Sequence, residues 1–494
     1  MAPHNEHWSA WPIIMFQLGL QTLGLRAYAV WAIPVITGHL MSVHLLWRIA
    51  RRGGIRIDVA TVALIPFGFM AAGHEVLLFA VNVGFAWAMA LGLLVILLAD
   101  IGTRRCILGA SLVALLALPT STHVVLLIAS AALLLLFRRQ ILSAMIVAGP
   151  AGIVWTLWYV TFGRETTAAD LSGGLGATAL FGLRMATNAA RGLTTLGLAP
   201  TAAIVGLLLI AALVAFATRR GASGIRPSMA VVLTTSALAF IGIVASGRGS
   251  ALGLADSSRY AWVVGLLVLP LLLHGVQHLA QVASPRGGVG ALIVLIGAVS
   301  LSSFGDLRDI TNQRAGLEQR LRARYLTQAQ LASQGVVVLN PDADQYWAPN
   351  LQVRELQDLI AAGRLTAETT TDAALQLEAL GELQVVYNAP RPFDEATQAR
   401  PRLAGARVAE VDCRSGSLAS PVTASLEGPG GLEIVTSPPN QLITLHLRDG
   451  SIATVTPRYI STQERRPLWI GHSPTTVELS PVSPDAGLLV CTTG

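Results

Sequence analysis

The sequence lacks lysine, so all 34 of its basic residues are arginine. Charged residues of both signs account for only 13% of its 494 residues, about half the share that is usual in soluble domains. A water-covered surface needs more charge than this, so most of the chain is not an ordinary soluble domain. The sequence also lacks a P-loop and a Gly-x-Ser-x-Gly elbow, which disfavours ATP-driven transport and serine hydrolysis in their familiar forms.

Metal ligands at recognisable spacing are also missing. His39 and His44 are five residues apart, and His274 and His278 are four apart, with no carboxylate or cysteine beside the second pair. We interpret both pairs as structural, because a zinc site needs three or four ligands. A divalent cation nevertheless stays a candidate cofactor.

The few charges are divided unevenly. Residues 1–302 contain 18 arginines against 7 acids, whereas residues 303–494 contain 16 arginines against 21 acids. The arginines of the first part lie mostly at the ends of apolar runs, where they orient membrane helices. The second part has no basic run, so we expect no nucleic-acid partner for either part.

Long apolar runs fill the first 304 residues. A bilayer crossing needs about 17–25 mostly apolar residues, and two of the runs, 106–119 and 122–137, are short for that length. The sequence therefore predicts a polytopic α-helical membrane protein with about eight to ten spans. The candidate spans are 27–47, 57–73, 77–99, 106–119, 122–137, 141–162, 201–218, 229–247, 260–282 and 288–304.

The short loops alternate between arginine-rich and arginine-poor, with a longer connection at 163–200. Excess arginine in short loops marks the cytoplasmic side, which predicts a multi-pass protein of the plasma membrane with both termini outside the cytoplasm. An exterior N-terminus without a leader is awkward. One explanation is a further span upstream of Met1, and a genuine start is the alternative. The arginine-rich loops contain Arg48, Arg51, Arg52 and Arg56; Arg104 and Arg105; Arg138 and Arg139; Arg219, Arg220 and Arg226; and Arg286.

The remaining sequence predicts an extracytoplasmic α/β region that ends in a β-sandwich. Residues 303–406 mix helical and strand patterns, including helices over 305–335 and 351–363 and a buried strand at Val336–Leu339. Short alternating strands broken by Gly and Pro fill 407–494, a pattern typical of sandwiches, some of which bind carbohydrate. Cys413 and Cys491 lie in this last module, and an exterior location permits a disulfide between its first and last strands.

Ionisable residues near the membrane are costly to place, so each is a functional candidate. Glu6, followed by His7, is a carboxylate positioned to deprotonate an acceptor hydroxyl; a solvated tail is the alternative. Glu75 and Asn82 are seven residues apart, which predicts one shared helix face that lines a polar cavity. The alternative for this pair is a capped interhelical turn with a packed Asn.

Arginine near the same exterior face is a candidate phosphate ligand. Arg248 and the run Ser257-Ser258-Arg259-Tyr260 lie on the last predicted exterior loop. A guanidinium group binds phosphate through two parallel hydrogen bonds, so these residues suit a lipid-linked phosphate. Ordinary contact with lipid headgroups is the alternative.

Several of these stretches resemble the GT-C class of integral membrane glycosyltransferases, and actinobacterial membrane proteins of that type in particular. The similar stretches are Glu6-His7-Trp8, Gly73-His74-Glu75, Gly84-Phe85 and Ser258-Arg259-Tyr260, all within residues 1–302. The resemblance implies a catalytic carboxylate in the first exterior loop, matched here by Glu6, and a polyprenyl-phosphate sugar as donor, with Arg259 on its phosphate. Together with the candidates identified from the residues themselves, the predicted substrate-binding set is His7, Glu75, Asn82, Arg248, Arg259 and Tyr260.

The resemblance also implies partners, which are membrane lipids, the donor and a glycan acceptor of the cell envelope. The chain departs from the class in having no span before Glu6 and in presenting Asn5-Glu6 where the class has an Asp or paired acids. A non-enzymatic transporter or a scaffold for envelope assembly is the rival hypothesis. Transporters tend to contain interrupted spans at matching positions, and the sequence displays no convincing pair.

Overall fold

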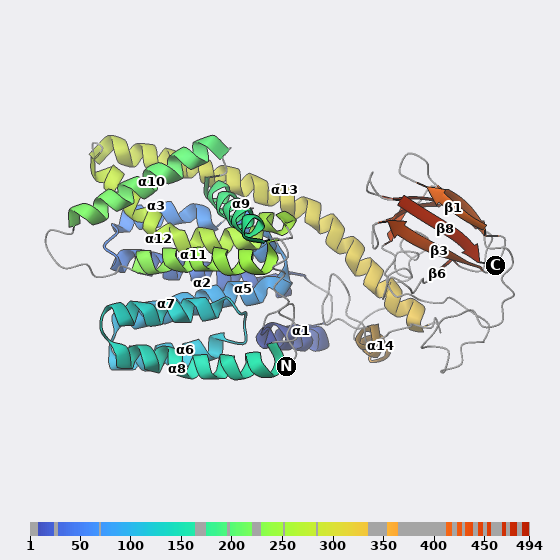
Figure 1. Cartoon of the computed structure of the whole chain (residues 1–494), viewed down its shortest axis with the longest axis horizontal. Helices are drawn as coiled ribbons and strands as arrows, with labels where there is room; N and C mark the ends of the chain where they lie inside the picture. The colour runs from blue at the N-terminus through green and yellow to red at the C-terminus, as the bar shows by residue number, and fades with distance from the viewer. Residues whose placement is uncertain are drawn as a thin grey trace. The chain divides into compact units, whose positions relative to one another are not determined.

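A computed structural model describes residues 8–23, 28–68, 71–163, 174–194, 198–219, 229–249, 252–282, 285–333 and 353–363, and eight strands between residues 412 and 493. The chain divides into two compact units (Figure 1). The first contains Met1–Leu20 and Arg26–Gln313, and the second contains Gln21–Leu25 and Arg314–Gly494. Glu6 and His7 lie outside the described residues.

Helices form the whole of the described part of the first unit. Four short helical turns interrupt the longer helices: η1 (Ala71–Gly73), η2 (Ala80–Asn82), the π-helical turn η3 (Tyr159–Gly163) and η5 (Leu252–Asp256). The longer helices are α1 (Ala10–Leu23), α2 (Tyr28–Arg52), α3 (Ile57–Gly68), α4 (His74–Leu78), α5 (Val83–Ile101), α6 (Arg104–Ala117), α7 (Val124–Phe137), α8 (Ile141–Trp158), α9 (Gly174–Thr194), α10 (Leu198–Arg219), α11 (Met229–Arg248), α12 (Ser258–Val282) and α13 (Pro285–Ser333).

Within the described residues, five helical segments are long and apolar enough to cross a membrane, and they include α2, α5, α8, α11 and α12. Two bent pairs raise the number to seven if each is one span: α3 with 71–78, bent by 54°, and α9 with 199–215, bent by 89°. The prediction of eight to ten spans also counts 106–119, 122–137 and 288–304. The first two correspond to α6 and α7, which have only 14 residues each.

Burial separates the helices into central and peripheral ones. In α12, 67% of the most apolar window is buried inside the protein, whereas in α8 the share is 22%. The exposed side of α8 presents large apolar residues, among them Ile141, Leu142, Ile153 and Leu157. Such a surface is unfavourable in water and suits lipid, as in a multi-pass membrane protein.

One predicted connection is wrong. Residues 174–194, inside the expected connection at 163–200, form helix α9, which packs against α11 and α12. Its buried Phe181, Met185 and Ala189 recur every four residues along one face. The interruptions by Gly and Thr obscure this stripe in the sequence, although its spacing is helical.

Polar contacts attach both ends of α12 to other segments. Near its start, Ser258 Oγ accepts a hydrogen bond from Glu75 N at 2.8 Å. Near its end, Gln277 accepts from Arg56 N at 2.6 Å and donates to Gly54 O at 3.3 Å. Residues 258 and 277 are 19 steps apart in this helix, or about 28 Å at 1.5 Å per residue. The Glu75 turn and the arginine-rich turn after α2 therefore lie about one bilayer thickness apart.

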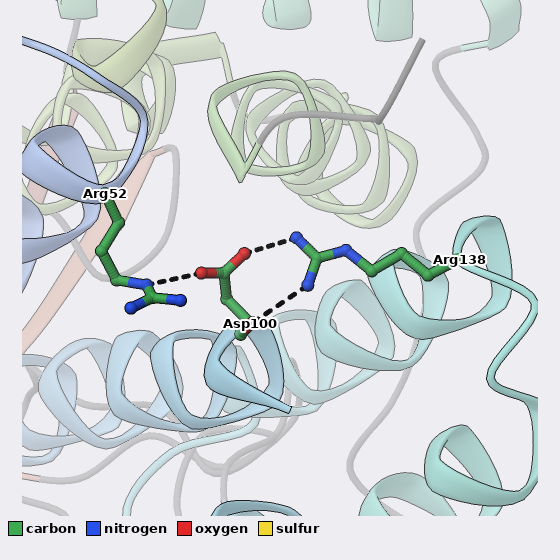
Figure 2. A network of polar contacts seen from close by, with 3 residues as sticks. All are labelled: Arg52, Asp100 and Arg138. Carbon is green, nitrogen blue, oxygen red and sulfur yellow. Dashed lines mark hydrogen bonds and ion pairs between the residues drawn. The ribbon is translucent and has the colours of Figure 1, made fainter. Parts of the chain in front are cut away.

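A second polar network joins α2, α5 and the turn after α7 (Figure 2). Asp100, whose side chain is only 9% exposed, accepts from Arg52 Nε at 2.6 Å and from Arg138 Nη2. Arg138 also donates to the backbone oxygen of Asp100 at 3.1 Å. A carboxylate in the last turn of a helix opposes the macrodipole, so the two cations offset an otherwise unfavourable charge.

The second unit contains the end of α13, the helix α14 (Val353–Ala361) and eight strands. Helices α13 and α14 confirm that residues 305–333 and 353–361 are helical, whereas the predicted strand Val336–Leu339 lies outside the described residues. The strands are β1 (Asp412–Gly416), β2 (Val422–Leu426), β3 (Gly430–Ser437), β4 (Ile443–Leu447), β5 (Ile452–Val455), β6 (Pro467–Ile470), β7 (Thr475–Pro481) and β8 (Gly487–Thr493).

The strands pair in two antiparallel sheets, ordered β1-β8-β3-β6 and β2-β7-β4-β5. In the first sheet, Cys413 of β1 is the register partner of Cys491 of β8. Directly opposite residues in antiparallel strands have Cα atoms about 4.5–5.5 Å apart, which is within the range that a disulfide spans. The packing of these sheets as a β-sandwich and the disulfide itself stay predictions.

We expect Asp100→Asn to lower the free energy of unfolding by about 2 kcal/mol, because both guanidinium groups lose their common counter-charge in a mostly buried place. Thermal unfolding in detergent measures this effect. The matched control is Asp58→Asn, which breaks an ion pair with Arg56 whose side chains are 45% and 54% exposed. The control should change stability by under about 1 kcal/mol, and an equal effect of both variants would contradict the assignment.

We expect the mature protein to contain a Cys413–Cys491 disulfide. Peptide mapping without reduction should recover the two cysteines in one linked species, with Cys106 still open to alkylation. The cross-link closes a loop of nearly 80 residues, so Cys413→Ser should destabilise the strand region by about 4 kcal/mol in the chain-entropy model. Alkylation of Cys413 and Cys491 without prior reduction would contradict the pairing.

Candidate functional site

The turn between α3 and α5 carries Glu75 on a short helix. Helix α4 has only five residues, and Phe79 then adopts an extended conformation with φ −101° and ψ 108° before η2 begins. Glu75 and Asn82 therefore do not share the face of one helix, and the predicted arrangement is wrong. The extended residue between them breaks the helical repeat on which that prediction depended.

Asn82 instead stabilises the turn. Its side chain is 9% exposed, and Asn82 Nδ2 donates to the backbone oxygen of Glu75 at 2.8 Å. This contact is the capped interhelical turn that the sequence analysis leaves open as the alternative. Because the amide holds the backbone of Glu75, it fixes where the carboxylate can point.

The Glu75 carboxylate meets the first turn of α12. Glu75 Oε2 accepts from Ser257 Oγ and from the backbone N–H of Arg259, the latter at 3.3 Å. Ser258 Oγ accepts from the backbone N–H of Glu75, so the two segments hold each other by reciprocal bonds. An anion is favourable at a helix N-terminus, where backbone N–H groups lack helical partners. Glu75 Oε1 accepts no hydrogen bond from the described residues.

Two guanidinium groups lie around one aromatic ring of the same segment, that of Tyr260. Tyr260 is 4% exposed, and its hydroxyl oxygen accepts from Arg248 Nη1. The guanidinium carbons of Arg248 and Arg259 lie 5.9 and 5.3 Å from the ring centroid, within the usual range for a cation–π contact. Phe240 packs edge-on against the same ring, at 6.1 Å between centroids. The ring thus holds two cations close together.

A neighbouring ion pair was not predicted from the sequence. Arg184 of α9 binds Asp256 through two hydrogen bonds, one of 2.9 Å from Nε. Asn188 donates to the backbone oxygen of Asp256 at 2.9 Å. These contacts attach α9 to η5, immediately before Ser257. The signal in the sequence was the four-residue spacing of Arg184 and Asn188, which places both on one helix face.

A buried contact between α2 and α12 fixes the position of α12. Trp262 is fully buried and donates from Nε1 to His39 Nδ1 at 3.2 Å. Since His39 Nδ1 accepts, its Nε2 carries the proton and donates to Phe67 O at 2.8 Å. Both ring nitrogens of His39 are used internally, which agrees with its interpretation as structural. Gly73 allows this arrangement, because a Cβ there would lie 2.4 Å from Trp262 Cδ1.

The structure thus brings together five of the predicted site residues: Glu75, Asn82, Arg248, Arg259 and Tyr260. Glu6 and His7 lie outside the described residues, and their roles stay predictions. Among the residues that are described, no group of three His, Cys, Asp or Glu side chains is placed to hold a metal ion. The cluster has two guanidinium groups and one carboxylate, an arrangement that suits an anionic ligand with a hydroxyl group.

We expect Gly73→Ala to destabilise the protein by about 1–3 kcal/mol, because the new methyl group overlaps the indole of Trp262 and displaces either α12 or the Glu75 turn. Thermal unfolding and Trp fluorescence in detergent measure the change. The matched control is Gly149→Ala in α8, where an added Cβ meets no atom within 4 Å. The control should be neutral or slightly stabilising. Equal stability of both variants would show that the Gly73–Trp262 contact does not constrain the fold.

No family model, curated protein or solved structure matches the chain. Its chemistry is therefore inferred from its own residues. The most informative of these are the Glu75 carboxylate and the two guanidinium groups around Tyr260.

Proposed function

We propose that this protein is a membrane glycosyltransferase that transfers a sugar from a polyprenyl-phosphate donor to a cell-envelope acceptor at the extracytoplasmic face. The observation that carries the proposal is the position of the Arg259 and Arg248 guanidinium groups around one ring, with the backbone N–H of Arg259 bound to Glu75. The cluster lies at the end of α12 that is remote from the arginine-rich turns. By the positive-inside rule, that end faces away from the cytoplasm.

Arg259 is the proposed ligand of the donor phosphate. Its backbone N–H binds Glu75, whereas its guanidinium group makes no hydrogen bond to a described residue. It therefore retains its N–H donors for two parallel bonds to phosphate oxygens. Its position in the first turn of α12 adds the favourable dipole of a 25-residue helix. Arg248, which also contacts this ring, adds a second positive charge.

The proposed mechanism needs a carboxylate near the acceptor hydroxyl. Glu6 is the proposed general base, on its resemblance to the acid of the GT-C class. Glu75 would bind the donor or acceptor through Oε1, because its other oxygen is engaged by Ser257 and Arg259. A metal ion is not required by any contact in this cluster, and a divalent cation stays a candidate only through the resemblance.

The strands at 412–493 fit the same proposal. The two four-stranded antiparallel sheets have the strand content of a β-sandwich, and we propose that this module binds the glycan acceptor. Its location outside the cytoplasm would also permit the Cys413–Cys491 disulfide.

Transport of a lipid-linked or anionic substrate is the second candidate function. The sequence displays no matched interrupted spans, but the structure has two bent helix pairs, 57–78 and 174–215. Helices of both pairs pack against α12, and interrupted helices next to a binding site are typical of secondary transporters. The Glu75 cluster would then bind a substrate anion rather than activate it.

We expect Arg259→Gln to lower kcat/KM for sugar transfer by about a hundredfold or more, because a charge-assisted bond to the donor phosphate is lost. The assay supplies proteoliposomes with a panel of radiolabelled polyprenyl-phosphate sugars and an envelope glycan fraction. Glu6→Gln and Glu75→Gln should each reduce transfer as strongly. The matched control is Arg191→Gln, an exposed arginine of α9, which should retain full activity.

The same proteoliposomes separate the two candidates. Transfer without net movement of substrate across the bilayer supports the enzyme. Movement of labelled substrate without transfer, lost in Arg259→Gln, supports the transporter. Transfer at an unchanged rate in Glu6→Gln would remove Glu6 from the mechanism.

A further inference from the structure

Positive charge is in excess at the end of the helical unit that is remote from the Glu75 turn. The ends of α2, α5 and α7 meet there through Asp100, as Figure 2 shows for Arg52 and Arg138. Residues 28–163 contain eight arginines, all at helix ends or in the turns between them, and only three acids. One acid, Glu75, belongs to the other end, and Asp58 pairs with Arg56. Seven arginines of this segment thus face one remaining carboxylate, that of Asp100, which contacts only Arg52 and Arg138.

Three of these arginines occupy positions that the local structure disfavours. Arg104 and Arg105 form the first turn of α6, which contains no acidic residue, although cations are unfavourable beside the positive end of a helix dipole. Arg139 has φ 61°, in the left-handed region that glycine or asparagine occupies at far lower cost. All three side chains are exposed, and none has a hydrogen-bond or ion-pair partner among the described residues. A bound anion would offset the electrostatic penalty at Arg104 and Arg105, and it would pair with the exposed guanidinium group of Arg139.

The Asp100 network holds two further guanidinium groups in place at this position. Arg52 uses only Nε toward Asp100, which leaves its two terminal nitrogens without a partner in the described part of the chain. Both terminal nitrogens of Arg138 donate to Asp100 and its Nε is buried, so Arg138 contributes positive charge to the position. Because Asp100 fixes both side chains, an anion that binds them orders fewer flexible groups on binding.

Large apolar side chains surround the charges. Phe137, Ile141 and Leu142 flank Arg138 and Arg139, and Leu108 and Leu112 follow Arg104 and Arg105 on α6; all five are 54–68% exposed. A soluble anion would gain nothing from this border, whereas acyl chains would cover it. We propose that this arginine cluster (Arg52, Arg104, Arg105, Arg138 and Arg139) is a specific binding site for the headgroup of an acidic phospholipid. The site lies at the far end of α12 from Glu75, so it does not depend on the proposed function.

The test measures lipid binding to the purified full-length protein by native mass spectrometry in detergent. Wild type should bind phosphatidylglycerol at least tenfold more tightly than phosphatidylcholine. The variant Arg104→Gln/Arg105→Gln/Arg139→Gly should lose about fivefold for each arginine, or about a hundredfold in affinity for phosphatidylglycerol. The control Arg56→Gln/Asp58→Asn removes a neutral pair from the same end and should bind within about twofold of wild type.

Thermal unfolding provides a second readout that a purely structural role would not produce. Without acidic lipid, the triple variant should be as stable as wild type or more stable, because it removes unfavourable charges and backbone strain. Addition of phosphatidylglycerol should raise the unfolding midpoint of wild type and leave that of the variant unchanged. Equal binding of phosphatidylglycerol to both proteins, or displacement of the lipid by inorganic phosphate at equal concentration, would overturn the proposal.

Discussion

Helix α12 is held at both ends by side chains that also fix the neighbouring turns, and most of the organisation described here depends on those contacts. Ser258 and Gln277 bind backbone groups of the Glu75 turn and of the turn after α2. Between them, the Trp262–His39 contact sets the distance between α12 and α2. The Trp262–His39 bond lies between the two ends, where a bilayer would offer no competing water, so a polar side chain without a partner there would be costly. The polar groups of α12 therefore act as fixed attachment points.

The two ends of this helix have different chemistry. One end combines a carboxylate with two guanidinium groups around a tyrosine, and the other combines one buried carboxylate with an excess of arginines. The first arrangement suits a small anionic ligand with a hydroxyl group, because its positive charges converge on one ring. The second is broad and bordered by apolar side chains, which suits a lipid surface. A transferase that takes a lipid-linked donor would benefit from both arrangements, since its donor is a lipid and the bilayer around it consists of lipids.

Several features of the fold follow from the sequence because they depend on local composition. Apolar runs of about 20 residues predict the membrane helices, since length alone matches them to a bilayer. The helices α13 and α14 and the short strands follow from periodicity. Helix α9 was missed, because glycine and threonine interrupt its apolar stripe. The bends after Gly68 and Thr194 were also missed, since helix direction depends on packing against α12 rather than on local propensity.

The sequence by itself determined that this is a helical chain with apolar segments that could cross a membrane and with sparse ionisable residues. The candidates that it identified are Glu6, His7, Glu75, Asn82, Arg248, Arg259 and Tyr260. Ionisable residues in apolar segments can be recognised in the sequence as unusual, because each charge near lipid is costly whatever its partners. Only the tertiary structure decided that five of these candidates meet, that Asn82 supports the turn, and that Asp100 gathers arginines from three helix ends. Those pairings join residues as many as 184 positions apart, and no local pattern encodes which buried polar groups will find one another.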